Sequence, residues 1–140
     1  MAAYGYDDKN RSLGFIKVNG QEITSTTRRK RGFTLARLGK DCMAMKITTY
    51  DTYASNTATS DLRDYLQNLS NESRVIGITH DSYFRSLGAA RPVLTELGIS
   101  LEKSSLRTSL GIALIKGRPK FTKQTLALRY QGPALLSAIL

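Results

Sequence analysis

The stretch that decides the fold is Arg74-Val-Ile-Gly-Ile-Thr79, a run of mostly β-branched residues without polar alternation. A strand with this pattern is typically buried on both faces, so the run predicts a central strand. Upstream, residues 32–38 and 42–50 each alternate apolar and polar side chains and are separated by a turn at residues 39–41, which predicts an antiparallel pair. The sequence therefore predicts a sheet built around residues 74–79.

Turn residues divide the rest of the chain into further strands. Asn19-Gly20 favours a tight type I′ hairpin that joins residues 13–18 to residues 21–25. Residues 1–12 are polar and rich in Gly, Asp and Asn, and we expect them to form a flexible arm ahead of a single domain at 13–140. Three later strands are predicted, at residues 108–115, 125–130 and 134–139.

Two segments have the apolar spacing of amphipathic helices. The first begins near Ser60, with Thr59 or Ser60 as the N-cap. The second is expected to begin with Asp81 as its cap and to end at Gly98, with Pro92 kinking or splitting it. Because strands outnumber helices and most connect locally, the predicted class is α+β, with two antiparallel, sandwich-like sheets flanked by two short helices.

The composition argues against several classes of function. A single cysteine, Cys42, and a single histidine, His80, leave neither an intrachain disulfide nor a zinc-ligand cluster, and no nucleophile motif or phosphate loop is present. We therefore expect no enzyme activity, no cofactor and no metal. No apolar run approaches the length of a membrane helix, and the first residues lack the apolar core of a signal peptide.

The formal charge of +10 will attract polyanions. The densest basic run is residues 28–31, for which a solvated turn and a functional role both stay open. The chain has no recognised nucleic-acid motif and no basic strand interleaved with aromatic residues, which argues against nucleic acid as the partner.

The order of several short motifs resembles one known family, the interleukin-like EMT inducer domain, also called the PANDER-like domain. The similarity spans nearly the whole predicted domain. The motifs that carry it are Arg31-Gly32-Phe-Thr-Leu-Ala, Thr49-Tyr-Asp-Thr-Tyr53, Val75-Ile-Gly-Ile-Thr-His-Asp81, Leu97-Gly98, Leu106-Arg107-Thr108 and Lys116-Gly117.

The resemblance implies a fold of two antiparallel sheets with short helices, secretion, and a non-catalytic role in signalling or in glycan binding. In a sugar-binding member of the family, the contacts come from positions that match Arg31, Asp81 and Arg107. A carboxylate can accept hydrogen bonds from two hydroxyls, and guanidinium groups donate with fixed geometry, so these residue types suit a hexose. Neighbouring candidates are His80, Ser82, Thr108 and, as the aromatic ring for stacking, Tyr83.

Departures from the family pattern refine these expectations. Ser82 stands where many relatives have a second acid and Thr108 where many have Asp, which leaves galactose and N-acetylglucosamine types of sugar both open. The family's cysteine pairs are missing, which favours a stand-alone lectin over a disulfide-stabilised hormone. Without a visible signal peptide, a cytoplasmic or vesicular store stays open beside secretion.

The leading hypothesis is thus a lectin that holds a terminal hexose or N-acetylhexosamine weakly at Arg31, Asp81 and Arg107. Weak single sites need multivalency, so we expect a homo-oligomer that cross-links glycans, with residues 134–140 as its interface. A secreted cytokine-like signalling ligand is the first alternative. A basic module that binds a polyanion or nucleic acid is the second, and it predicts strong weakening by salt.

Overall fold

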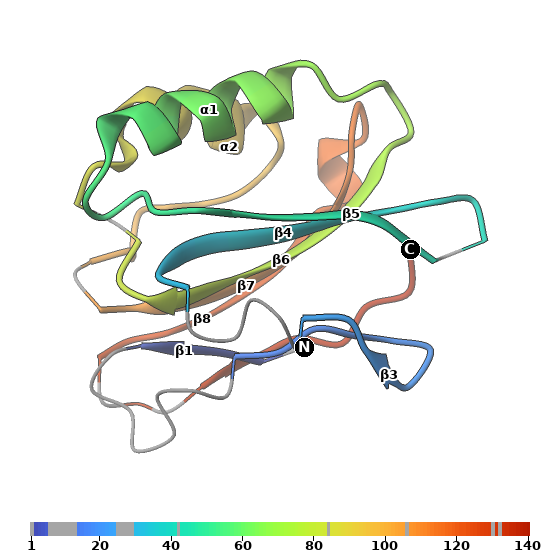
Figure 1. The fold of residues 1–140 in the computed structure, drawn as a ribbon, viewed down its shortest axis with the longest axis horizontal. Coiled ribbons are helices and arrows are strands. Elements are labelled where there is room, and N and C mark those ends of the chain that lie inside the picture. Colours follow the sequence, from blue (N-terminus) through green and yellow to red (C-terminus); the bar gives the residue numbers. More distant parts are fainter. Residues whose placement is uncertain are drawn as a thin grey trace.

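The computed structural model describes residues 2–5, 14–24, 30–41, 43–83, 85–105, 107–129, 131 and 133–140 of the chain, the first four by their backbone only. Along the described residues, strands come first, and helical segments are then interspersed among the later strands (Figure 1). The elements are β1 (Ala2–Gly5), β2 (Lys17–Val18), β3 (Gln21–Glu22), β4 (Gly32–Leu38), β5 (Ala44–Tyr50), α1 (Asn56–Gln67), β6 (Arg74–Asp81), the 3-10 helix η1 (Leu87–Ala90), α2 (Arg91–Glu96), β7 (Ser109–Ile115), the 3-10 helix η2 (Pro119–Phe121), β8 (Lys123–Ala127) and β9 (Ala134–Leu135).

Strand β6 lies at the centre of the sheet, as its sequence predicts. It pairs antiparallel with β4 on one side and with β7 on the other, and the outer strands β5 and β8 complete an antiparallel set of five. At its end, β6 also pairs parallel with β1, where Tyr4 lies opposite His80, and β9 pairs antiparallel with β1. The hairpin β2–β3 forms a separate two-stranded sheet.

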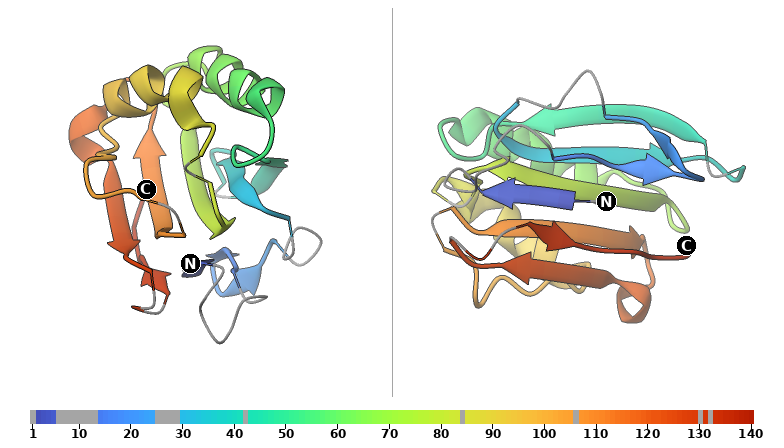
Figure 2. Two further views of the ribbon diagram at one scale, coloured as in Figure 1. Left: turned by 90° about the vertical axis from the view of Figure 1, so that its left-hand side faces the viewer. Right: turned by 90° about the horizontal axis from the view of Figure 1, so that it is seen from below.

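The two faces of the central sheet carry different cores. Large side chains at alternate strand positions, such as Phe33, Leu35 and Ile112, pack under the helices. Smaller ones, such as Ala36 and Ala113, face the opposite layer. Helices α1 and α2 cover the first face, whereas β1, β9 and the hairpin β2–β3 lie against the second (Figures 1 and 2). The predicted α+β class, with antiparallel sheets and two short helices, is confirmed.

The predicted hairpin is present, and the predicted arm is wrong for four residues. Asn19 and Gly20 have φ angles of 50° and 82°, as a type I′ turn requires. Ala2–Gly5, assigned above to a flexible arm, forms β1 instead. Its sequence carries no strand pattern, and the hydrogen bonds come from β6 and β9 on either side, so tertiary context decides this strand. The rest of the arm lies outside the described residues.

Both helix starts differ from the prediction. Helix α1 begins one turn early, because the Ser55 hydroxyl accepts a hydrogen bond from the N–H of Ala58 at 3.0 Å and caps it. Asp81 caps no helix, since it ends β6, and the second helical segment begins at Leu87 as η1. The second segment is divided as predicted, since η1 ends at Ala90 and α2 follows with Pro92 in its first turn, and Gly98, with a φ of 84°, ends it as expected.

The C-terminal strands are shorter than predicted. The strand expected at 125–130 is β8, which ends at Ala127, and Tyr130 lies outside the described residues. The strand expected at 134–139 contains only the two residues of β9, followed by irregular chain to Leu140. Within the described residues, the helices are all too short or too polar to cross a membrane.

Candidate functional site

A small pocket of about 170 Å³ lies where β6 ends. Because β4 and β7 both run antiparallel to β6, their first residues meet its last residue at one edge of the sheet. This arrangement brings together side chains that are far apart in the sequence. The pocket is lined by Arg31, Tyr53, Asp81, Ser82 and Arg107.

The backbone is constrained around this pocket. Asp81 and Arg107 have φ angles of 61° and 63°, a left-handed conformation that few residues other than glycine adopt. Gly32 has a φ of 101°, and a Cβ atom there would collide with the carbonyl oxygen of Tyr50. Residues held in such conformations cluster at binding sites, where they fix the direction of a side chain.

Arg31 is oriented by a carboxylate and by an aromatic ring. Its Nε and Nη2 donate to Oδ1 and Oδ2 of Asp51 at 3.0 and 2.7 Å, and its guanidinium lies 4.8 Å from the centre of the Tyr53 ring. Asp51 Oδ1 also accepts from the N–H groups of Tyr53 and Ala54. The hydrogen bond from Arg31 is the main cause that lowers the pKa of Asp51, and the same bond raises the pKa of Arg31. The guanidinium is therefore held in one position at the pocket wall.

Asp81 supplies the carboxylate that lines the pocket. Burial raises its pKa, because the charged form loses hydration, while the positive charges of Arg31, His80 and Arg107 act in the opposite direction. The carboxylate is thus partly dehydrated and shares its pocket with two arginines, so hydrogen bonds to a ligand there are stronger than in water.

Ser82 contributes a hydroxyl group to the same wall. Its side chain is only 3% exposed, and among the described residues its Oγ has no hydrogen-bond partner. Buried polar atoms are nearly always hydrogen-bonded, so an unpartnered one beside a pocket indicates a place for a ligand group or a water molecule.

The other three candidates from the sequence lie away from the pocket. Tyr83 is fully buried, its ring packs edge-to-face on Phe33, and its hydroxyl bonds with Ser104 and Thr108 at 2.8 and 3.1 Å. Its ring therefore has no face to offer for stacking on a sugar. Thr108 is fully buried in the same network, and its hydroxyl donates to the carbonyl of Ser105. His80 is buried on β6, and burial lowers its pKa.

Sequence reasoning missed two residues of the site, Tyr53 and Asp51. Both lie directly after β5, in the stretch Tyr50-Asp-Thr-Tyr53 that contributes to the family resemblance, and this was the available signal. Arg85 also lies over the Tyr53 ring, 5.6 Å from its centre. The ring thus supports two guanidinium groups at the rim of the pocket.

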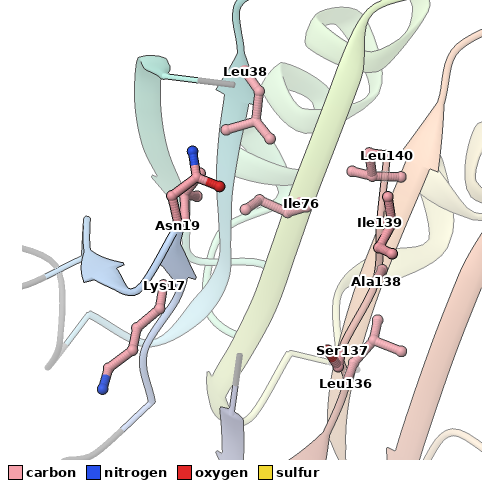
Figure 3. Close-up of a pocket in the computed structure, with 10 residues that line it drawn as sticks. Lys17, Asn19, Leu38, Ile76, Leu136, Ser137, Ala138, Ile139 and Leu140 are labelled. Atoms are coloured by element: carbon pink, nitrogen blue, oxygen red, sulfur yellow. The ribbon is translucent and has the colours of Figure 1, made fainter. Parts of the chain in front are cut away.

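A second, more apolar pocket of about 250 Å³ lies on the face of the sheet that the hairpin β2–β3 covers (Figure 3). The hairpin β2–β3 borders it on one side and the C-terminal segment on the other, with Leu38 and Ile76 between them. Leu135 and Ile139 in that segment are 64% and 98% exposed. The predicted interface residues 134–140 are thus partly core and partly surface.

The described residues contain no group of three His, Cys, Asp or Glu side chains that could hold a metal ion. Among known proteins, the model of the interleukin-like EMT inducer family matches residues 31–118 of the chain. The matched region begins at Arg31 and contains Asp81 and Arg107, so it includes the whole pocket. No curated protein matches the chain.

Proposed function

The chain belongs to the interleukin-like EMT inducer family, and on that premise we propose that it is a lectin that binds a terminal hexose or N-acetylhexosamine without catalysis. The observation that carries the proposal is that Asp81, Arg31 and Arg107 line the same small surface pocket. A carboxylate accepts hydrogen bonds from two adjacent sugar hydroxyls, which ties the ligand down in one orientation.

The donors around the carboxylate support a sugar ligand. Arg31 is already fixed by Asp51, so its remaining N–H groups keep a constant direction toward a ring hydroxyl or an acetamido oxygen. The unpartnered Ser82 hydroxyl offers a further donor or acceptor. A pocket of about 170 Å³ is smaller than those that enclose drug-sized molecules, so it suits one terminal sugar ring rather than a chain.

A shallow site of this kind binds weakly. A hydrated ligand held by a few hydrogen bonds reaches an affinity of roughly the millimolar range. We therefore propose that several copies of the chain act together on multivalent glycans outside the cell. The exposed side chains of Leu135 and Ile139 support the C-terminal segment as the contact between copies.

The experiment is a glycan array at low and high salt with two matched variants. Asp81→Asn removes the carboxylate charge while asparagine tolerates the left-handed backbone, so the fold is retained. Asp61→Asn makes the same change on the exposed surface of α1 and serves as the control. We expect binding to terminal hexoses that resists salt, is lost in Asp81→Asn and is retained in Asp61→Asn.

Other outcomes would assign a different function. Absence of glycan binding at every salt concentration would contradict the lectin and favour a signalling ligand. Binding that is confined to sulfated glycans, disappears in high salt and is equal in both variants would also contradict it, and would favour polyanion binding.

A further inference from the structure

A separate, basic pocket of about 340 Å³ lies at the other end of β6, where that strand begins. The end of β4, the turn that follows it and the loop before β6 form its walls. Three cationic side chains line it from three segments: Arg37, Lys40 and Arg74. It shares no residue with the Asp81 pocket, and the eight-residue strand separates the two by roughly 23 Å.

Arg74 lines this pocket and has a donor without an acceptor. Its Nε is buried, and no hydrogen-bond acceptor reaches it among the described residues. A buried guanidinium N–H without an acceptor is unfavourable, because it has lost its water and gained nothing in return. An anion in the pocket would supply the missing acceptor.

The register of the sheet places further positive charge together. Arg37 on β4 lies directly opposite Lys46 on β5, and like charges in that position repel each other. The Lys46 amine lies 5.6 Å from the centre of the Tyr65 ring, which only partly offsets its charge. Within the described part of the chain, no ion pair joins Arg37, Lys40, Lys46 or Arg74 to a carboxylate.

One carboxylate, Glu72, also lines the pocket, and Asp41 lies in the neighbouring turn, but both have partners elsewhere. Asp41 accepts a hydrogen bond from the N–H of Met43 within the turn, and Glu72 pairs with Arg118 at 2.8 Å. Neither carboxylate makes an ion pair with the cations that line the pocket. The cluster therefore keeps an excess of positive charge, which a bound anion would neutralise.

We propose that this pocket binds a sulfate or phosphate monoester group. Such a group is tetrahedral and doubly or nearly doubly charged, so it suits a pocket that several cationic donors line, as Arg37, Lys40 and Arg74 line this one. Ser70 and Ser73 line the same pocket, and their hydroxyls lie 3.0 Å apart. Their mutual bond uses one hydroxyl hydrogen and leaves the other to donate to the anion.

The test is a titration of the ¹⁵N-labelled protein with sodium sulfate and then sodium phosphate, against sodium chloride at equal ionic strength, followed by NMR. We expect saturable shifts at residues 37–40 and 70–74 and at the Arg74 Nε–H signal, without shifts at Asp81 or Ser82. Glucose 6-sulfate and glucose 6-phosphate, compared at the same concentrations, then show which monoester the pocket prefers.

Variants make the test specific. Arg74→Gln should weaken anion affinity by about tenfold or more, and Lys40→Ala by about threefold to tenfold. Lys40 is exposed, so its substitution keeps the fold and the test remains valid if Arg74→Gln destabilises the strand. The control Lys120→Ala, on the exposed η2, should leave the affinity unchanged. Shifts scattered over all basic residues, or equal affinity in Lys40→Ala and Lys120→Ala, would overturn the proposal.

This test is independent of the lectin. A neutral hexose should shift signals at the Asp81 end of β6, and sulfate at the Arg74 end. Either response can fail while the other persists, so the two proposals are judged separately.

Discussion

The pockets at the two ends of strand β6 differ in whether carboxylates balance their positive charge. At the Asp81 end, the two arginines of the pocket lie beside two carboxylates, and Asp51 holds Arg31 through two hydrogen bonds. At the Arg74 end, no carboxylate pairs with the pocket cations within the described residues. Under the two proposals above, the pocket with paired charges suits a neutral, directional ligand, and the pocket with unpaired cations suits an anion.

The salt dependence of ligand affinity distinguishes these two types of site. A neutral ligand that hydrogen-bonds to residues with paired charges has an affinity that depends little on ionic strength. A cationic cluster without paired carboxylates loses affinity for an anion as salt screens its charge. This difference requires that the backbone at the Asp81 end is rigid and that its two aspartates have different roles.

The largest effect is expected from Gly32→Ala at the Asp81 end. The new Cβ would collide with the Tyr50 carbonyl, and alanine disfavours the left-handed backbone, so unfolding free energy should fall by more than about 2 kcal/mol. Gly88→Ala is the control, since a Cβ there meets nothing within 4 Å. Urea denaturation followed by circular dichroism measures both, and equal stabilities would show that the pocket backbone is not constrained.

A smaller loss is expected from Tyr83→Phe, which removes the hydroxyl that joins Ser104 and Thr108. A lost buried hydrogen bond should cost about 1–2 kcal/mol of stability, while sugar affinity stays unchanged because the ring lies in the interior. Tyr53→Leu should have the opposite effect. Sugar affinity should fall, because Arg31 loses the ring that orients it, while stability changes little. A Tyr83→Phe protein with normal stability and reduced sugar binding would contradict this division.

The smallest effect concerns the pH dependence of stability at the two aspartates. The pKa of Asp51 is lowered in the fold, so it stabilises the protein above its unfolded-state pKa, and this contribution is lost as pH falls through the folded pKa. The pKa of Asp81 is raised, so its contribution is present at low pH and is lost as pH rises through the folded value.

Asp51→Asn should therefore be less stable than the parent protein at neutral pH, by less than about 1 kcal/mol because the pair is partly exposed. Asp81→Asn should be at least as stable as the parent protein at neutral pH, and both differences should shrink toward about pH 3. Melting temperatures from pH 3 to 7 test the signs. A destabilised Asp81→Asn at neutral pH would show that its carboxylate is structurally required.

Much of the fold was predictable because strand patterns reflect burial directly. The β-branched run of β6 predicts a strand buried on both faces, as observed, whereas the alternation in β4 predicts the strand but not its burial on both faces. Strand β1 was not predictable, because Ala2–Gly5 has no pattern of its own and depends on pairing with distant segments. The start of α1 was missed because its first turn contains few large apolar residues, so the cap at Ser55 lies ahead of the visible helical spacing.

The candidate site was predictable where it rested on the family resemblance, which pointed to Arg31, Asp81 and Arg107, and these three do line one pocket. The residues around these three could not be predicted in the same way. Strand alternation stops at Asp81, whose left-handed backbone changes the direction of the chain, so sequence spacing could not tell that Ser82 faces the pocket and Tyr83 the core. Tyr53 was missed because its role depends on a contact with Arg31 across two strands.

The left-handed backbone at Asp81 and Arg107 determines which positions of the pocket can be varied in protein engineering. Few side chains tolerate that conformation, so a library that randomised these two positions would consist mostly of unstable proteins. Tyr53 and Ser82 have negative φ angles and line the same pocket. Selection for a new sugar preference should therefore vary Tyr53 and Ser82 and keep Asp81 and Arg107 as fixed anchors.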